Sequence, residues 1–70
     1  MDIEYLNKLR RRYIDAAQRS SRCAYNVDLR VARGTPPSDE ELRAQRDAHN
    51  QLVSARVAYL HALTQYKQAL

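Results

Sequence analysis

The sequence predicts an all-α fold, an antiparallel hairpin of two helices at about residues 3–33 and 39–69, forming one domain of residues 1–70. Two observations predict it. Apolar side chains recur every three or four residues along both halves of the chain, as they do on one face of a helix. The one glycine and both prolines fall together at Gly34-Thr35-Pro36-Pro37, between those halves. A connection this short lets the second helix only fold back along the first.

The first helix is predicted from an apolar row that runs along almost its whole length. The row contains Leu6, Leu9, Tyr13, Ala16, Ala17, Ser20, Cys23, Ala24, Val27 and Val31. A basic stripe lies about 120° away around the helix, at about 100° per residue. It contains Lys8, Arg12, Arg19, Arg22, Arg30 and Arg33, and Asp15 and Asn26 interrupt it. A sparse third line holds Ile3, Ile14 and Tyr25.

The residues of the break between the helices each have a specific structural role. Gly34 can adopt the left-handed conformation that closes a helix, and the prolines prevent the helix from continuing. Ser38 and Glu41 are spaced as a capping box, in which hydroxyl and carboxylate oxygens accept hydrogen bonds from amide groups at a helix start. The second helix is therefore expected to begin just after Ser38.

The second helix carries two apolar rows. The wide row contains Ala44, Ala48, Leu52, Ala55, Tyr59, Ala62, Leu63, Tyr66, Ala69 and Leu70. The second row lies about 140° away and contains Leu42, Val53, Val57 and Leu60. Folding back pairs residues whose numbers sum to about 72, so Tyr13 is expected opposite Tyr59 and Ala24 opposite Ala48.

A hairpin has one internal seam, which leaves the second apolar row uncovered. A domain of 70 residues buries little surface, and such domains commonly add disulfides, metals or oligomerisation. Cys23 is the only cysteine, so an internal disulfide is impossible. The second row is therefore expected either to form a homodimer, a four-helix bundle, or to dock another protein.

The sequence predicts no enzyme, cofactor or metal site. His49 and His61 point in different directions from one helix, with too few further ligands for zinc. Cys23 lies on the apolar row, where a packed side chain rather than a nucleophile is expected. One glycine leaves no phosphate-binding loop.

The basic residues of the first helix form a second surface that could bind a partner. The chain has 12 Lys and Arg against 8 Asp and Glu, and residues 1–34 hold eight of the bases and four of the acids. The basic stripe of the first helix therefore permits three readings: a solvated face, contact with an acidic protein or small anion, or contact with a phosphate backbone. It contains no aromatic side chain on which bases could stack.

Four tyrosines are predicted at the open end of the hairpin: Tyr5, Tyr13, Tyr59 and Tyr66. Tyrosine suits half-buried positions, where its ring packs and its hydroxyl stays in water. These rings are expected either to fill the wide end of the hairpin or to form a binding hot spot for a partner.

We expect a cytoplasmic protein that does not enter a membrane. The chain has a single cysteine and an acidic start, Met1-Asp2-Ile3-Glu4, and it has no apolar run near the ~20 residues that a membrane span needs.

The layout of helix, short break and helix resembles that of the Rop-type plasmid copy-number regulators. Those hairpins dimerise into a four-helix bundle and bind paired RNA stem-loops through one bundle face. The resemblance covers the layout of the whole chain and includes no residue motif; it implies RNA or DNA binding through the basic stripe as an alternative function. Separately, Leu42-Arg43-Ala44-Gln45-Arg46 and residues 54–63 are similar to coiled-coil hairpins of outer-membrane efflux channels, from which no function is carried over.

The expected function is that of a non-catalytic regulator or adaptor, an inhibitor, anti-activator or chaperone of the kind found among small bacterial and phage proteins. It would act as a homodimer and bind another protein. The residues expected to contact partners are Tyr5, Tyr13, Tyr59, Tyr66, Leu42, Val53, Val57 and Leu60. The alternatives are nucleic acid or an anionic small ligand, held by Lys8, Arg12, Arg19, Arg22, Arg30 and Arg33.

Overall fold

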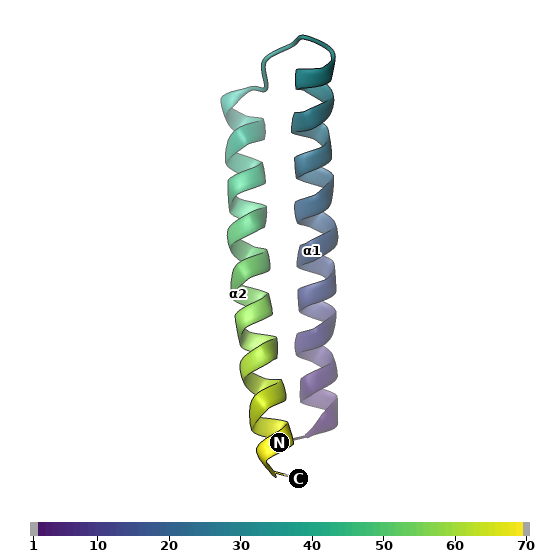
Figure 1. Cartoon of the computed structure of the whole chain (residues 1–70), viewed down its shortest axis with the longest axis vertical. Coiled ribbons are helices and arrows are strands. Elements are labelled where there is room, and N and C mark those ends of the chain that lie inside the picture. Colours follow the sequence, from purple (N-terminus) through teal and green to yellow (C-terminus); the bar gives the residue numbers. More distant parts are fainter. Residues whose placement is uncertain (1, 70) are drawn as a thin grey trace.

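The structure, a computed structural model, describes residues 2–69 and contains two helices, α1 (Ile3–Ala32) and α2 (Asp39–Ala69). They run side by side in opposite directions, so the start of α1 and the end of α2 lie at one end of a rod (Figure 1). The rod measures 53 × 14 × 13 Å. The predicted helical hairpin is confirmed, with α1 one residue shorter than expected. Leu70, predicted at the open end, lies outside the described residues.

Local hydrogen bonds explain where the helices begin and end. Gly34 has φ of 75°, and its N–H donates to the Val31 carbonyl at 3.0 Å, while the Thr35 N–H donates to the Arg30 carbonyl at 3.0 Å. These two bonds form a Schellman motif, which closes α1 as the sequence predicts. At the other end of α1 an Asp2 carboxylate oxygen accepts the Glu4 N–H at 3.1 Å.

The seam between the helices follows a repeat of seven residues. On α1 the buried and half-buried side chains include Leu6, Leu9, Tyr13, Ala16, Ser20, Cys23 and Val27. On α2 they include Glu41, Gln45, Ala48, Leu52, Ala55, Tyr59, Ala62 and Tyr66. Steps alternate between three and four residues throughout, which is the heptad pattern of helices that wind around each other with a left-handed supercoil.

This repeat corrects the predicted rows at two residues near the loop. Val31, expected in the seam, is 62% exposed, and Ala44 is exposed as well. The prediction used about 100° per residue, whereas a heptad seam drifts about 20° around a straight helix in every seven residues. Near the loop the seam position of α1 is occupied by Arg30, which pairs with Glu41 but stays exposed, and that of α2 by the half-buried Gln45.

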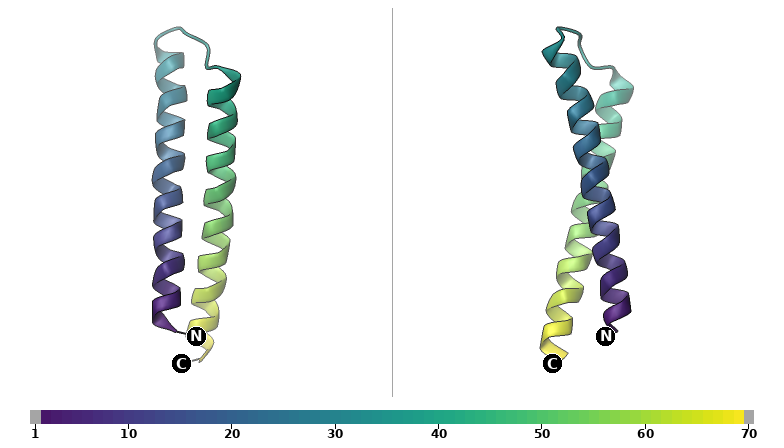
Figure 2. Two further views of the ribbon diagram at one scale, coloured as in Figure 1. Left: turned by 180° about the vertical axis from the view of Figure 1, so that it is seen from behind. Right: turned by 90° about the vertical axis from the view of Figure 1, so that its right-hand side faces the viewer.

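The crossing of the helices is visible from the side, where α1 and α2 intersect near their middles (Figure 2). Tyr13 and Tyr59 meet across the seam, with stacked rings whose centroids are 5.9 Å apart. The predicted pairing of residues whose numbers sum to about 72 is therefore confirmed at this position.

The interior of the rod is thin. The buried residues are Leu6, Leu9, Ala16, Val27, Ala48 and Ala62, and among the described residues no large side chain is fully buried. The radius of gyration is 15.8 Å, whereas about 11 Å is expected for a compact domain of this length. The accessible surface is 5529 Å², about 1,000 Å² more than a compact monomer of this mass exposes.

Candidate interaction surfaces

The seam divides the hairpin into two broad faces, and grooves along the seam show which side chains share each face. One groove is lined by Arg12, Arg19, Gln51 and Ala55, among others. There the Arg19 Nη1 donates to the Gln51 Oε1 at 2.9 Å. The other face has a groove lined by Ser20, Ala24, Leu42, Gln45, Arg46 and His49. Arginines of α1 and Leu42 of α2 therefore lie on opposite faces.

The face that holds Leu42 gathers most of the exposed aliphatic side chains. In the heptad repeat Ile3, Val31 and Leu42 lie next to the seam on this side, and Ile14, Val53 and Leu60 lie one position further out on the same flank. All six are among the large apolar side chains that the described structure leaves exposed; Val53 and Leu60 are each 46% exposed. We call these six residues the apolar face.

The remaining exposed apolar side chains lie elsewhere. Val57, predicted in the second apolar row, is 61% exposed and falls opposite the seam, where it belongs to neither face. Tyr25 also points outward from the back of its helix. Tyr5 is exposed on the side of the arginines.

The opposite face carries the basic stripe. Lys8, Arg12, Arg19, Arg22, Arg30 and Arg33 are all exposed, as the sequence predicts. Between residues 2 and 69 only Arg30 makes an ion pair, and Arg19 makes the neutral bond to Gln51. We call the six residues the arginine face. Their charges are largely uncompensated by carboxylates of the hairpin.

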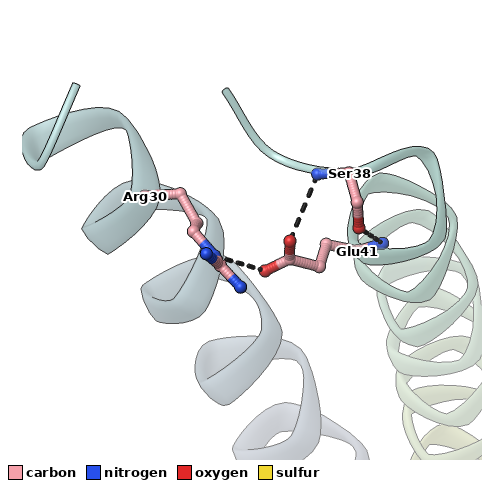
Figure 3. Close-up of polar contacts among 3 residues, drawn as sticks. All are labelled: Arg30, Ser38 and Glu41. Carbon is pink, nitrogen blue, oxygen red and sulfur yellow. Dashed lines mark hydrogen bonds and ion pairs between the residues drawn. The ribbon is translucent and has the colours of Figure 1, made fainter. Parts of the chain in front are cut away.

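The loop end is held by a cluster of three side chains (Figure 3). The Glu41 N–H donates to Ser38 Oγ at 3.0 Å, and the Ser38 N–H donates to Glu41 Oε1 at 3.2 Å. The predicted capping box is thus confirmed. The Arg30 Nε donates to the other Glu41 carboxylate oxygen at 3.2 Å and ties α1 to the start of α2.

The cluster lowers the pKa of Glu41 below its ordinary value of 4.5. The main cause is the hydrogen bond from the Ser38 backbone, with further contributions from the Ser38 hydroxyl and from Arg30; partial burial of the carboxylate opposes them. Glu41 and Arg30 therefore have a structural role, because their ion pair joins α1 to the start of α2 at the loop end.

The tyrosines do not form one exposed cluster. Tyr59 and Tyr66 pack with Leu63 against Leu6, Leu9 and Ala62 at the open end, and all three are half-buried. Tyr13 is half-buried beneath the Tyr59 ring. Of the four tyrosines predicted to meet a partner, Tyr5 alone is exposed, at 50%.

The titratable side chains that a catalyst would use are dispersed. His49 is exposed, and the exposed His61 ring nitrogen lies 3.2 Å from Gln65 Nε2. Cys23 is half-buried in the seam. No group of three potential metal ligands is found among residues 2–69. Neither α1 nor α2 is long and apolar enough to cross a membrane.

No protein-family model matches the chain, and comparison with curated proteins and with solved structures finds no match either.

The residues missed by the sequence analysis are those that α1 adds to the apolar face. Ile3 and Ile14 were placed on a separate line, and Val31 was placed in the seam. Their signal is present in the sequence: in a seven-residue register they fall on the same flank of the seam as Leu42, Val53 and Leu60.

Proposed function

We propose that this protein is a non-catalytic regulator or adaptor that acts as a helical homodimer and binds another protein. The observation that supports this proposal is the apolar face, six aliphatic side chains on one side of a hairpin that leaves them exposed. Isolated exposed aliphatic residues are ordinary on a protein surface, but a row contributed by two helices is typical of an interaction site.

The dimensions of the rod support self-association in particular. Two antiparallel helices bury one stripe each, and the stable small helical folds add further helices around a shared core. A second copy placed on the apolar face would supply them. Burial of apolar surface stabilises such an assembly by about 25 cal/mol per Å².

The surfaces that a homodimer of this kind leaves open are the arginine face and the open end with Tyr5. Arginine and tyrosine are enriched where proteins meet partners, because they combine apolar contact area with hydrogen-bonding groups. A protein partner with acidic side chains would complement this surface. Binding to such a partner would inhibit it, protect it or bridge it to another molecule.

Sedimentation of the purified chain tests the self-association on which this proposal depends. We expect a dimer at micromolar concentration and a monomer of reduced helicity for Leu60→Glu, because the charge would be buried in the dimer. Ser54→Glu is the matched control, since Ser54 is exposed on the same helix and lines a groove with Arg12 on the other face. A wild-type monomer, or an unchanged Leu60→Glu dimer, would refute the proposed surface.

Protein binding is tested by affinity capture from the native host after nuclease treatment, with identification of the captured chain by mass. The identified chain is then expected to bind the purified wild type and to lose affinity for the Arg12→Glu variant. Capture that disappears after nuclease treatment would contradict the protein-binding function and favour the alternative.

That alternative is a nucleic-acid or small-anion binder. Exposed Lys8, Arg12, Arg22 and Arg33 favour it, because none of them has an ion-pair partner within the described chain. Binding through phosphate contacts should weaken steeply with salt, since each neutralised phosphate releases counterion. A titration with an oligonucleotide at two salt concentrations separates this function from binding through apolar contacts, which tolerates salt. The same titration with inorganic phosphate tests the small-anion reading.

A further inference from the structure

We infer that two copies of this chain pack through their apolar faces in antiparallel orientation, with the loop end of each copy against the open end of the other. The inference deepens the proposed function and rests on the self-association that it assumes. It adds which residues of the two copies meet, how the two rods are oriented, and where the twofold axis lies.

The area available fits a stable dimer. Two separate copies expose 5529 Å² each, whereas a compact body of twice the mass exposes about 7,500 Å². At most about 3,600 Å² can therefore be removed from water in total. This value lies within the range of about 2,000–5,000 Å² that permanent homodimers bury.

The distribution of charge along the rod selects the orientation. The loop half, residues 20–52, holds five basic and five acidic residues. The open half, residues 1–19 with 53–70, holds seven basic and three acidic residues, so it carries the whole net charge of +4. Parallel packing would bring two positive halves together. Antiparallel packing lays each positive half on a neutral half, which avoids that repulsion.

Charges beside the apolar face show the same asymmetry. In the heptad register Arg10, Arg56 and Lys67 share the positions of the apolar face in the open half, and Asp28, Asp39 and Arg46 share them in the loop half, so these charges alternate with its aliphatic side chains. A symmetric homodimer repeats every contact twice. Antiparallel packing therefore offers two of the three open-half bases, Arg10 and Lys67, a carboxylate of the other copy.

Full overlap of two antiparallel rods places the twofold axis near their middle, at the level of Val53. With the axis there, each α1 lies along the α1 of the other copy, and each α2 along the other α2. Arg10 then comes level with Asp28 of the second copy, and Lys67 with Asp39. Leu42 comes within about one helical turn of Leu60 of the second copy. Both charge pairs join opposite signs.

Spin labels at two exposed positions outside the apolar face test the orientation. Asn50→Cys and Arg43→Cys, which lie at the same heptad position of α2, are made separately in a Cys23→Ser background, and the distance between the two labels of a dimer is measured by pulsed electron paramagnetic resonance. At 1.5 Å rise per residue, antiparallel packing separates the two labels at position 43 by about 30 Å along the rod. The two labels at position 50 are separated along the rod by only about 9 Å.

Because side chains at positions 43 and 50 leave α2 in the same direction, we expect a much longer distance for position 43 than for position 50. Equal distances at both positions would show parallel packing and overturn the inference, while the proposed homodimer would stand. A sedimentation profile of a monomer for the unlabelled wild type would instead overturn the proposed function, so the two failures are distinguishable.

Charge reversal provides a second, independent readout. Arg10→Asp should weaken dimerisation about tenfold, because each dimer would then contain two pairs in which the new carboxylate repels Asp28 of the other copy. Asp28→Arg in the same chain should restore most of the affinity. Arg11→Asp, one residue away at the back of α1, is the control and should change the affinity little. Failure of Asp28→Arg to restore affinity would overturn the contact between these residues.

Discussion

Replacing Ser38 with alanine is expected to lower the free energy of unfolding by about 1 kcal/mol per chain. The Ser38 Oγ accepts the Glu41 N–H at 3.0 Å, and this N–H is one of the donors that a helix start leaves without a backbone partner. Loss of such a cap costs about 0.5–2 kcal/mol. Ser38 is exposed, so water replaces part of the lost bond and the expected cost stays near the middle of the range.

The assay is thermal and urea unfolding followed by circular dichroism, at one fixed protein concentration, because association would make the midpoint concentration-dependent. For a domain of this size a loss of about 1 kcal/mol lowers the melting temperature by roughly 4–8 °C. The slope of the urea transition should stay unchanged, since the same surface is exposed on unfolding.

Ser54→Ala is the matched control, because it makes the same substitution at an exposed position inside α2. Alanine has the higher helix propensity, so this variant should be as stable as the wild type or slightly more stable. If Ser38→Ala melts at the same temperature as Ser54→Ala, the capping box contributes nothing and the reasoning is refuted.

Three further predictions concern the loop, the open end and pH. Gly34→Ala should lower the free energy of unfolding by about 1 kcal/mol in the same assay, because φ of 75° disfavours any side chain. No atom lies within 4 Å of the added Cβ, so an unchanged midpoint would mean that the loop relaxes and that φ imposes no cost. Tyr59→Ala should lower the free energy of unfolding by about 2 kcal/mol, because it removes the ring that stacks on Tyr13 and packs at the open end. Tyr25→Ala, at an exposed position, should lower it little, and equal losses for the two variants would contradict the packing of Tyr59. Because the pKa of Glu41 is lowered in the folded state, the stability that this group adds is fully present above its ordinary value of 4.5 and declines as the pH falls below it. Glu41→Gln should therefore flatten the acid limb of a plot of melting temperature against pH, and an unchanged limb would show that other groups control it.

Much of the hairpin could be predicted from individual residues. Gly34 and the two prolines determine where α1 stops, and Ser38 with Glu41 determines where α2 starts, because these effects act within one turn of backbone. The pairing of Tyr13 with Tyr59 also follows from a short connection between two long helices. Val31 and Ala44 were misplaced because their burial depends on how the helices wind around each other, which a count of 100° per residue does not include.

The sequence by itself determined that two helices form, where they end, and which angular stripe each residue occupies on its own helix. Local hydrogen bonding and helical periodicity are sufficient for that. Only the tertiary structure decided how the stripes of the two helices combine, because this depends on the rotation of each helix about its axis when the seam closes. That rotation placed Arg12 and Arg19 beside Gln51 on one face and Leu42 beside Ala24 on the other. It also brought Ile14 to the same side as Val53 and Leu60, so that a row on one helix became a face of the molecule.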